Sequence, residues 1–470
     1  MTPQIATAAY LMMIAGLFWL DRQSRSETTR ALWIPTLWLL IIGSRPVSLW
    51  LDPGRVTQVT ADTLEGSPVD ATVFGILVLA ALGVLAARRK RTLSFLRANT
   101  PVLLFFVYCA ISVFWSDYSF VAFKRWIKAI GDLAMVLVIV TDLNPTAALQ
   151  RVLSRMAFVL LPLSVLFIKY YPDFGRTYNP WTWLPQYGGV TMFKNLLGET
   201  CLVAGLGSVW SFTTVLRNRE GGHRLRRMGS HAIIIVMAVY LCKIADSMTS
   251  FSCLMFGGTL IVLTSQRQIR RRPAAIHLLV TLLILIALCA VFLPGANLVQ
   301  SLGRDSTLTG RTAIWAAAIS VARSPLGGAG FESFWTGDRV RKIWGLINEP
   351  GIQEAHNGYL EVYLNLGWIG VILLGILIVS GYRNVMTLFR RDRNAGTIRL
   401  AYFVTALIFS FTEAGFRMMS VAWIAFLIAT LAVPPGKRSK KHSGALAGND
   451  LARPVPAESS AAYEDALEAI

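Results

Sequence analysis

The chain has 470 residues, of which 54% are hydrophobic and only 15% are charged, and its mean hydropathy is +0.53. Soluble domains carry about 25% charged residues, so this composition excludes a soluble globular protein. The formal net charge of +19 would suit a nucleic-acid-binding protein. The basic residues, however, stand in short clusters between long apolar runs, which is typical of multi-span membrane proteins. Nucleic acid is therefore excluded as a partner.

Apolar runs of about 18 residues or more recur along the chain, and each can cross a hydrocarbon layer of about 30 Å as a helix. Barrel strands are shorter and alternate in polarity. The predicted fold class is therefore all-α, a polytopic membrane helix bundle of about thirteen transmembrane helices. The first run lacks a preceding basic region and is interpreted as a span, not as a cleaved signal. The predicted spans are 4–20, 31–50, 71–87, 100–115, 126–141, 152–169, 190–213, 231–245, 249–265, 274–293, 358–381, 400–412 and 417–433.

Alternate connections between these spans differ in charge. One set is rich in Arg and Lys and is expected in the cytoplasm, namely 22–30, 88–97, 217–227, 267–272, 383–399 and the segment after 434. The other set is expected outside and comprises 51–70, 170–189 and 294–357. The N-terminus is then outside and the C-terminus is cytoplasmic. Three regions follow: N-terminal transmembrane helices over 1–99, a transmembrane core over 100–433 that includes the outer loop 294–357, and a disordered cytoplasmic tail over 434–470.

The cysteines and acidic residues give no sign of a metal or a disulfide framework. All five cysteines lie in or beside apolar segments without a CxxC pair, and they are interpreted as small buried hydrophobic residues. They are Cys109, Cys201, Cys242, Cys253 and Cys289. The outer loops contain no Asp-x-Asp motif and no His/Cys cluster. We therefore predict neither a metal site nor a cofactor.

The outer loop 294–357 is basic, against the charge rule that orients the rest of the chain. Its cations are Arg304, Arg311, Arg323, Arg339, Arg341 and Lys342, and the outer segment 169–194 adds Lys169, Arg176 and Lys194. Long loops cross membranes regardless of charge, so a solvated surface is one interpretation. Aromatic residues such as Trp181, Trp335 and Trp344 lie among these cations. The combination also suits a lipid-linked anionic sugar, with guanidinium groups for phosphate and rings for sugar faces.

The loop contains a predicted helix over 309–323, with Thr309 as N-cap and Ser324-Pro325 as the stop. Arg311 falls in its first turn, where a cation is unfavourable against the helix dipole by a few tenths of a kcal/mol. That cost makes sense if Arg311 and the helix N-terminus bind an anion together. The glycine-rich run 327–330 is interpreted as a turn, with a phosphate cradle as the alternative.

His356 is the one histidine of five that is predicted on the outer side. It precedes a predicted helix over 358–380, so its imidazole is expected at the outer membrane boundary. A neutral histidine there would suit a general base, and a capping or packing role is the alternative. Glu413 lies between the last two predicted spans near Arg417, and a structural ion pair is the favoured interpretation.

Five motifs resemble those of the O-antigen ligase and polymerase superfamily, in particular its exopolysaccharide polymerase branch (ExoQ-like, Wzy-type). Three come from the outer loop and the helix after it: GRDSTLTGRTAIW (303–315), SPLGGAGFESFW (324–335) and EAHNGYLEVYLNLGWIG (354–370). Two lie upstream: FKRWIKAIGDL (123–133) and MFKNLLGE (192–199). The resemblance covers about residues 100–420.

The resemblance implies a metal-independent glycosyltransferase of the bacterial inner membrane, with no cofactor and with loop 294–357 in the periplasm. Its partners would be a polyprenyl (undecaprenyl) diphosphate-linked saccharide donor, a saccharide acceptor, the lipid bilayer and proteins of polysaccharide assembly. His356 would deprotonate or orient the acceptor hydroxyl, and Arg311 would bind the leaving diphosphate. Further diphosphate contacts would come from Arg176, Lys194 and Arg304, and secondary roles would fall to Asp305, Tyr359 and Glu361. Many relatives carry a histidine where this chain has Phe193.

Three functions remain open at this stage. A polymerase joins lipid-linked repeat units, a ligase moves a finished glycan to the lipid A core, and a transporter or flippase only moves the lipid-linked saccharide. A transporter needs ionisable residues along a path through its spans, whereas here the basic and aromatic residues gather outside. The resemblance favours the polymerase over the ligase.

Overall fold

The computed structural model describes residues 2–22, 28–52, 66–178, 184–217, 223–266, 273–292, 311–322 and 324–434. The chain divides into two units, 1–433 and 434–470, and all that follows concerns the first. The predicted tail after Pro434, the loop segment 293–310 and the residues Trp181, Trp183 and Arg323 lie outside the described residues.

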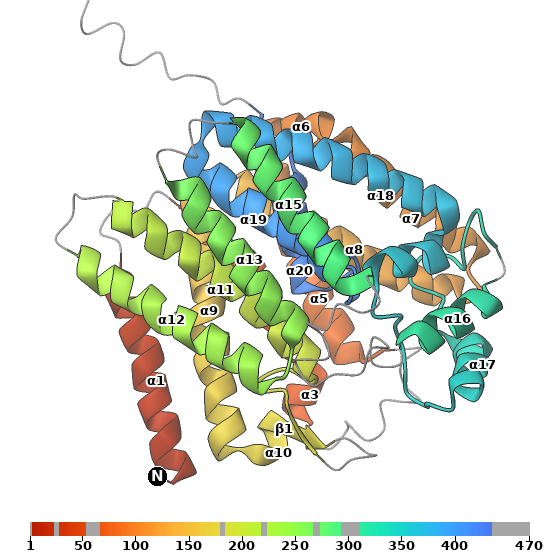
Figure 1. Cartoon of the computed structure of the whole chain (residues 1–470), viewed down its shortest axis with the longest axis horizontal. Helices are drawn as coiled ribbons and strands as arrows, with labels where there is room; N and C mark the ends of the chain where they lie inside the picture. Colours follow the sequence, from red (N-terminus) through yellow and green to blue (C-terminus); the bar gives the residue numbers. More distant parts are fainter. Residues whose placement is uncertain are drawn as a thin grey trace, which may run out of the picture. The chain divides into compact units, whose positions relative to one another are not determined.

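The described chain is almost entirely helical, with one two-stranded antiparallel sheet (Figure 1). The elements are α1 (Pro3–Leu20), η1 (Arg30–Leu32), α2 (Trp33–Ile42), α3 (Val47–Leu51), α5 (Pro68–Ala87), α6 (Arg89–Ala98), α7 (Thr100–Ser112), η3 (Val113–Trp115), α8 (Ser119–Val140), α9 (Pro145–Tyr170), α10 (Pro172–Gly175), β1 (Arg176–Tyr178), β2 (Pro185–Tyr187), α11 (Lys194–Arg217), α12 (Arg224–Ile244), α13 (Met248–Ser265), α15 (Pro273–Phe292), α16 (Arg311–Val321), α17 (Gly337–Ile347), α18 (Gly358–Arg391), α19 (Arg393–Phe409) and α20 (Val421–Thr430).

Seven helices of the described chain are long and apolar enough to cross a membrane: α1, α5, α9, α11, α12, α13 and α18. The pair formed by α6 and α7 with η3 is bent by 87° and would count as an eighth. The predicted all-α membrane bundle is thus confirmed, while the count of about thirteen spans stays a prediction. The expected span 31–50 is wrong as one helix, because α2 ends at Ile42 and α3 begins at Val47.

The peripheral helices expose large apolar side chains. Met12 of α1 and Leu79 of α5 are each 70% exposed, and Leu278 of α15 is 69% exposed. Soluble proteins rarely expose such surfaces over whole helices. Hydrocarbon around these helices explains the exposure, since lipid carries no penalty for apolar contact.

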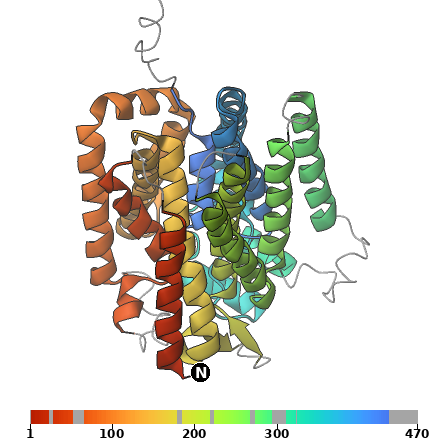
Figure 2. The same cartoon turned by 90° about the vertical axis from the view of Figure 1, so that its left-hand side faces the viewer.

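The interior of the bundle is formed by α11, α19 and α20. α11 packs against α9, α12, α13, α19 and α20 (Figures 1 and 2). Close approach depends on small residues, because a Cβ on Gly257 of α13 would lie 2.7 Å from Thr405 of α19 and 2.8 Å from Leu206 of α11. Polar side chains in this interior find backbone partners; Tyr402, for example, donates to the carbonyl of Val203 at 2.9 Å. The four described cysteines, Cys109, Cys201, Cys242 and Cys253, are buried and free, as predicted.

The two kinds of connection gather at opposite ends of the helices. At one end, basic residues pair with acidic ones, as in Arg88 with Asp142 at 2.9 Å and Arg227 with Asp21 at 3.1 Å. The other end, called here the loop end, carries residues 171–178, 184–193, 311–322, 324–357 and 410–420. The helix α9 joins the two ends, since it begins after Asn144 and finishes at Tyr170.

A break in α18 shapes the loop end. Gly367 has φ 64° and ψ −166°, a conformation that is essentially restricted to glycine. The loop before α17 fills the break: Trp368 N–H donates to the carbonyl of Pro325 at 2.9 Å, and Ala329 N–H donates to that of Leu364 at 3.0 Å. The helix predicted over 358–380 therefore exists, but it is longer and divided in two.

The glycine-rich run 327–330 is part of the loop that fills the break in α18. Gly328 N–H donates to Ser324, Ala329 N–H to Leu364 and Gly330 N–H to Asn365. These three donors are used within the protein, so the run forms the predicted turn and does not cradle a phosphate. The helix predicted over 309–323 is confirmed as α16, which ends at Val321, while Thr309 lies outside the described residues.

Candidate active site

Two segments distant in sequence meet where α18 begins. The Asn357 side chain caps α18 by accepting from the N–H groups of Tyr359 and Leu360, both at 3.0 Å. Its amide nitrogen also donates to the carbonyl of Phe411 at 3.2 Å. Gly358 N–H lies 2.8 Å from the carbonyl of Ser410 and 3.0 Å from that of Glu413. The start of α18 is thereby tied to the connection between α19 and α20.

Glu413 links the two residues on which the sequence analysis concentrated. Its Oε1 lies 2.9 Å from a guanidinium nitrogen of Arg311, and its Oε2 lies 3.3 Å from Nδ1 of His356. A second carboxylate, that of Glu354, lies 2.8 Å from the same imidazole nitrogen. Glu413 is nearly buried, with 8% of its side chain exposed, whereas 26% of His356 is exposed. The structure therefore brings Arg311 and His356 together through a shared carboxylate.

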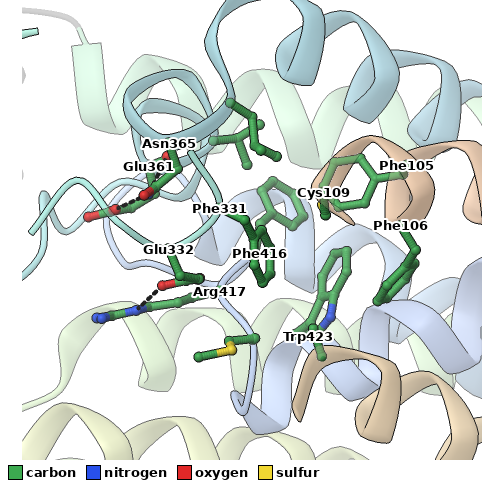
Figure 3. A pocket seen from close by; sticks show the side chains of 14 residues that line it. Phe105, Phe106, Cys109, Phe331, Glu332, Glu361, Asn365, Phe416, Arg417 and Trp423 are labelled. Carbon is green, nitrogen blue, oxygen red and sulfur yellow. Dashed lines mark hydrogen bonds and ion pairs between the residues drawn. The ribbon is translucent and has the colours of Figure 1, made fainter. Parts of the chain in front are cut away.

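Glu354 is also shared between two cations, His356 and Arg417. Arg417 lies 3.4 Å from Glu354 and 3.1 Å from Glu332, and Figure 3 shows the second of these pairs. We call this set the charge cluster; it consists of Arg311, Glu332, Glu354, His356, Glu413 and Arg417. With His356 protonated it holds three carboxylates and three cations, so its formal charges balance.

The carboxylates change the titration of His356. Burial alone would lower its pKa, but hydrogen bonds and charges from Glu354 and Glu413 raise the pKa to about 10. Burial would likewise raise the pKa of Glu354, yet His356, Arg417 and Arg311 lower it to about 2. These contacts favour a protonated imidazole at neutral pH, whereas a neutral histidine was expected from the sequence.

The expected partner of Glu413 is also wrong. Glu413 pairs with Arg311 and His356, while Arg417 pairs with Glu332 and Glu354. The reason is tertiary: the connection 410–420 turns so that Glu413 faces α16 and Arg417 faces the loop that carries Glu332. Sequence reasoning missed Glu354, which stands only two positions before His356 in the quoted motif and was open to recognition there. Glu332 also stands in a quoted motif, that of residues 324–335, whereas Arg417 carries no comparable local signal.

Glu354, His356 and Glu413 could chemically serve as metal ligands, since their ligand atoms all lie within 4.8 Å of one another. The sequence showed no such group because its members come from two distant segments. A metal ion here would compete with the ion pairs of Arg311 with Glu413 and of Arg417 with Glu354, and it would require His356 in its neutral form.

The other predicted phosphate-binding cations that the structure describes, Arg176 and Lys194, contact residues that lie outside the charge cluster. Arg176 donates from Nε to the carbonyl of Ile168 at 2.9 Å and stacks on Tyr187. Lys194 is 3.6 Å from Asp246, while the amide of its neighbour Asn195 reaches Glu413 at 3.3 Å. Arg304 and Asp305 lie outside the described residues.

Tyr359 and Glu361 hold the start of α18 in place. The hydroxyl of Tyr359 donates to the carbonyl of Leu407 at 3.1 Å, and its ring packs on Phe411 and Phe416. Glu361 is buried and accepts from Trp335 Nε1 at 2.9 Å and from Ala355 N–H. It lines a small cavity of about 30 Å³ next to Arg417 (Figure 3). Through Ala355, Glu361 fixes the backbone directly before His356.

The upstream motif 123–133 contacts the segments that carry Glu332 and Arg417. Asp132 of α8 accepts from Trp38 Nε1 at 2.9 Å and from Met419 N–H at 2.8 Å. Arg125 donates to the backbone carbonyl of Glu332. The motif thus anchors both segments that carry Arg417 and Glu332.

Comparison with known proteins bears on this site. The family model described as O-antigen ligase (Wzy_C) matches residues 232–375, which include Arg311, Glu354 and His356. The "Exopolysaccharide production protein ExoQ" of Rhizobium meliloti (strain 1021) is 26% identical over 320 residues, which are 66% of this chain and 70% of that protein. Residues 232–375 thus match the O-antigen ligase family model, and the chain is similar over two thirds of its length to an exopolysaccharide production protein.

Proposed function

We propose that the protein is a polymerase that joins polyprenyl-diphosphate-linked saccharide units at the outer leaflet of the bacterial inner membrane. The observation that carries the proposal is the pairing of Arg311 and His356 through Glu413 at the start of two helices. Two cations held on one buried carboxylate suit a reaction in which a diphosphate departs. The similarity to an exopolysaccharide production protein favours polymer formation as the outcome.

The proposed step is a displacement at the anomeric carbon. An acceptor hydroxyl forms a bond to C1 of the donor saccharide while the bond from C1 to the diphosphate oxygen breaks. The hydroxyl proton ends on the departing diphosphate or in solvent. Negative charge therefore grows on the leaving group, and donors that are already in place stabilise this charge best.

Arg311 is the first residue of α16, and the first N–H groups of a helix have no partner within that helix. A helix N-terminus favours anions through both its dipole and these donors. We assign the leaving diphosphate to this position. Arg176, Lys194 and Arg304 are proposed as further contacts to the same diphosphate, and Asp305 as a residue that orients an arginine.

His356 acts in this proposal as a cation. With a pKa of about 10, only about one molecule in a thousand has a neutral imidazole at pH 7. The Nδ1 atom faces Glu354 and Glu413, which leaves Nε2 to donate to the diphosphate oxygen. The role of general base is the rival assignment, and the two roles give opposite pH dependences, described below.

The proposed reaction uses no metal, because Arg311, Arg417 and the His356 imidazolium can donate charge-assisted hydrogen bonds to a diphosphate while their carboxylate partners hold them in place. Added chelator should leave the transfer rate of the purified protein unchanged, and restoration of a lost activity by Mg²⁺ or Mn²⁺ would contradict this part of the proposal.

A ligase that transfers a finished glycan is the second candidate, because the matching family model is described as O-antigen ligase. Deletion of the gene followed by analysis of lipid-linked saccharides separates the two. Single repeat units accumulate if a polymerase is lost, whereas full-length polymer stays on its carrier lipid if a ligase is lost. Complementation with His356→Ala or Arg311→Ala should fail at wild-type protein levels. Normal polysaccharide from both variants would refute the site.

A further inference from the structure

A groove of about 460 Å³ opens at the loop end, apart from the charge cluster. It lies between the end of α7 with η3, the loop 324–334 that fills the break in α18, and the first half of α18 itself. Its volume falls in the range of sites for small ligands, about 300–1,000 Å³. No residue of the charge cluster lines it, so it is a separate feature of the described chain.

Aromatic rings form much of the groove wall, and several are fixed in place. Trp115 donates from Nε1 to the carbonyl of Gly327 at 3.2 Å, and Tyr108 donates to the carbonyl of Leu366 at 3.0 Å. Tyr363 packs against Trp368 with ring centroids 5.4 Å apart. Because these polar atoms are engaged by the walls, the rings offer their faces without further ordering. Preformed ring faces suit the flat C–H-bearing faces of sugar rings.

A charged pair supplies the polar side of the groove. Arg339 lies over the ring of Phe334 at 5.3 Å and donates to Asp117 at 2.5 Å. The Arg339 side chain is only 10% exposed, whereas that of Asp117 is 54% exposed. The arginine therefore holds the carboxylate in place while the carboxylate remains open to solvent. A carboxylate held in this way accepts hydrogen bonds from neighbouring hydroxyl groups.

We propose that this groove binds the sugar rings of a saccharide substrate. The inference rests on the proposed function and adds to it a glycan subsite away from the reacting atoms. A carrier-lipid chain in the groove would desolvate Asp117 and Arg339 without giving hydrogen bonds in return, which is unfavourable. A saccharide offers both the apolar faces and the hydroxyl groups that this wall requires.

The position of the groove fits a glycan that reaches the charge cluster. Tyr363 and Leu364, which line it, lie five and six residues after Gly358, the first residue of α18, and His356 stands two residues before Gly358. At 1.5 Å per residue, Tyr363 is roughly 8 Å along the helix axis from the start of α18. Between the two sites, Trp335 and Ala355 both bind Glu361, so the groove wall and the backbone before His356 share one anchor. A short oligosaccharide spans such a distance.

Binding of lipid-free glycan tests the inference. The full-length protein is placed in nanodiscs of phosphatidylethanolamine and phosphatidylglycerol. It is then titrated with oligosaccharides of one to three repeat units, released by mild acid from the polysaccharide of its own host. Trp115→Ala and Tyr363→Ala should each weaken binding at least tenfold, whereas Trp115→Phe should retain it. Phe114→Ala is the matched control, because Phe114 is 87% exposed and does not line the groove.

A parallel titration with undecaprenyl phosphate distinguishes the occupants. Its affinity should be the same in all variants. If Trp115→Ala and Tyr363→Ala weaken the binding of this lipid and leave the oligosaccharide unchanged, the groove holds lipid and the inference is overturned. Unchanged binding of both probes overturns it as well.

The same assays separate this inference from the proposed function. His356→Ala should abolish transfer and still bind the oligosaccharides with wild-type affinity. If the groove variants bind normally while His356→Ala remains inactive, the glycan subsite is wrong and the proposed function stands. If the groove variants lose binding but the gene deletion leaves polymer formation and transfer intact, the proposed function is wrong.

Discussion

His356 is held by two carboxylates and stands in a left-handed backbone conformation, with φ 49°. Residues other than glycine adopt this region at a cost, so contacts around the histidine must supply the compensation. Those contacts are ionic, and their strength depends on the protonation of His356. The pKa of about 10, compared with 6.5 for a free histidine, means that the folded protein holds the proton more tightly. The ion pairs therefore contribute fully below pH 6.5 and are lost as the pH rises through 10.

The raised pKa of His356 predicts how the transfer rate depends on pH. If His356 acts as a cation, the transfer rate should stay high through neutral pH and fall as the pH approaches 10; a general base would give a rate that rises over that interval. Glu413→Gln removes one of the two carboxylates and should lower the pKa of His356 by about 1–3 units. The alkaline fall should then begin at a correspondingly lower pH. The pH–rate profile of the two purified proteins measures both effects, and a rising profile would rule out the cationic role.

Arg417 gives a second prediction at this scale, on stability. It is shared by Glu332 and Glu354, and its removal takes this cation from Glu332 and leaves Glu354 with its His356 contact. Arg417→Met should therefore destabilise the protein by about 3 kcal/mol. Arg341→Met is the control, because the ion pair of Arg341 with Asp338 is exposed and such pairs contribute about 0–1 kcal/mol. Thermal unfolding in detergent compares the two, and equal midpoints would contradict the structural weight given to Arg417.

At the scale of elements, the loop end depends on the way α18 is interrupted. The carbonyls of Pro325 and Leu326 accept from the N–H groups of Trp368 and Ile369, which begin the second half of the helix. These backbone hydrogen bonds therefore hold the loop 324–330 in place, and they also give partners to the first N–H groups after the break in α18. Because the same loop carries one wall of the proposed glycan groove, the break in the helix also sets the groove's shape.

Replacement of the glycine at the break tests this dependence. Gly367→Ala introduces a Cβ against the carbonyl of Leu326 and forces a side chain into a glycine conformation. We expect a loss of about 2–4 kcal/mol and faster proteolysis within the loop. Gly375→Ala on the same helix has no neighbour within 4 Å of its new Cβ and should be neutral or stabilising by up to about 1 kcal/mol. Comparable stability of the two variants would show that the loop does not need the break.

At the scale of the whole molecule, described basic residues such as Arg88 and Arg227 lie at one end of the membrane helices and the charge cluster at the other. The positive-inside rule then predicts that the charge cluster faces away from the cytoplasm. This orientation matters for function, because a lipid-linked saccharide at the outer leaflet can reach only an outward-facing site.

Labelling of single introduced cysteines tests the orientation. Gly345→Cys on α17 and Arg390→Cys at the end of α18 are both at exposed positions of opposite ends. A membrane-impermeant maleimide should label Gly345→Cys in intact spheroplasts and Arg390→Cys only after permeabilisation. The buried native cysteines at 109, 201, 242 and 253 should give little background, and the unmodified protein measures it directly. The reverse labelling pattern would invert the proposed topology.

The sequence by itself determined the environment of this protein. Long apolar runs predict helices in lipid, because a helix satisfies its own backbone groups. Ser324-Pro325 predicts the end of α16, because proline acts on the residues next to it. It also singled out Arg311 and His356, since each stands in a recognisable local motif. Only the tertiary structure decided their charge state and partners. Glu413 and Arg417 come from a connection more than fifty residues after His356, and the direction in which each side chain points depends on how that connection turns. The charge state of a residue depends on charges within a few ångströms. Here those charges come from segments distant in sequence, so no local pattern predicts them.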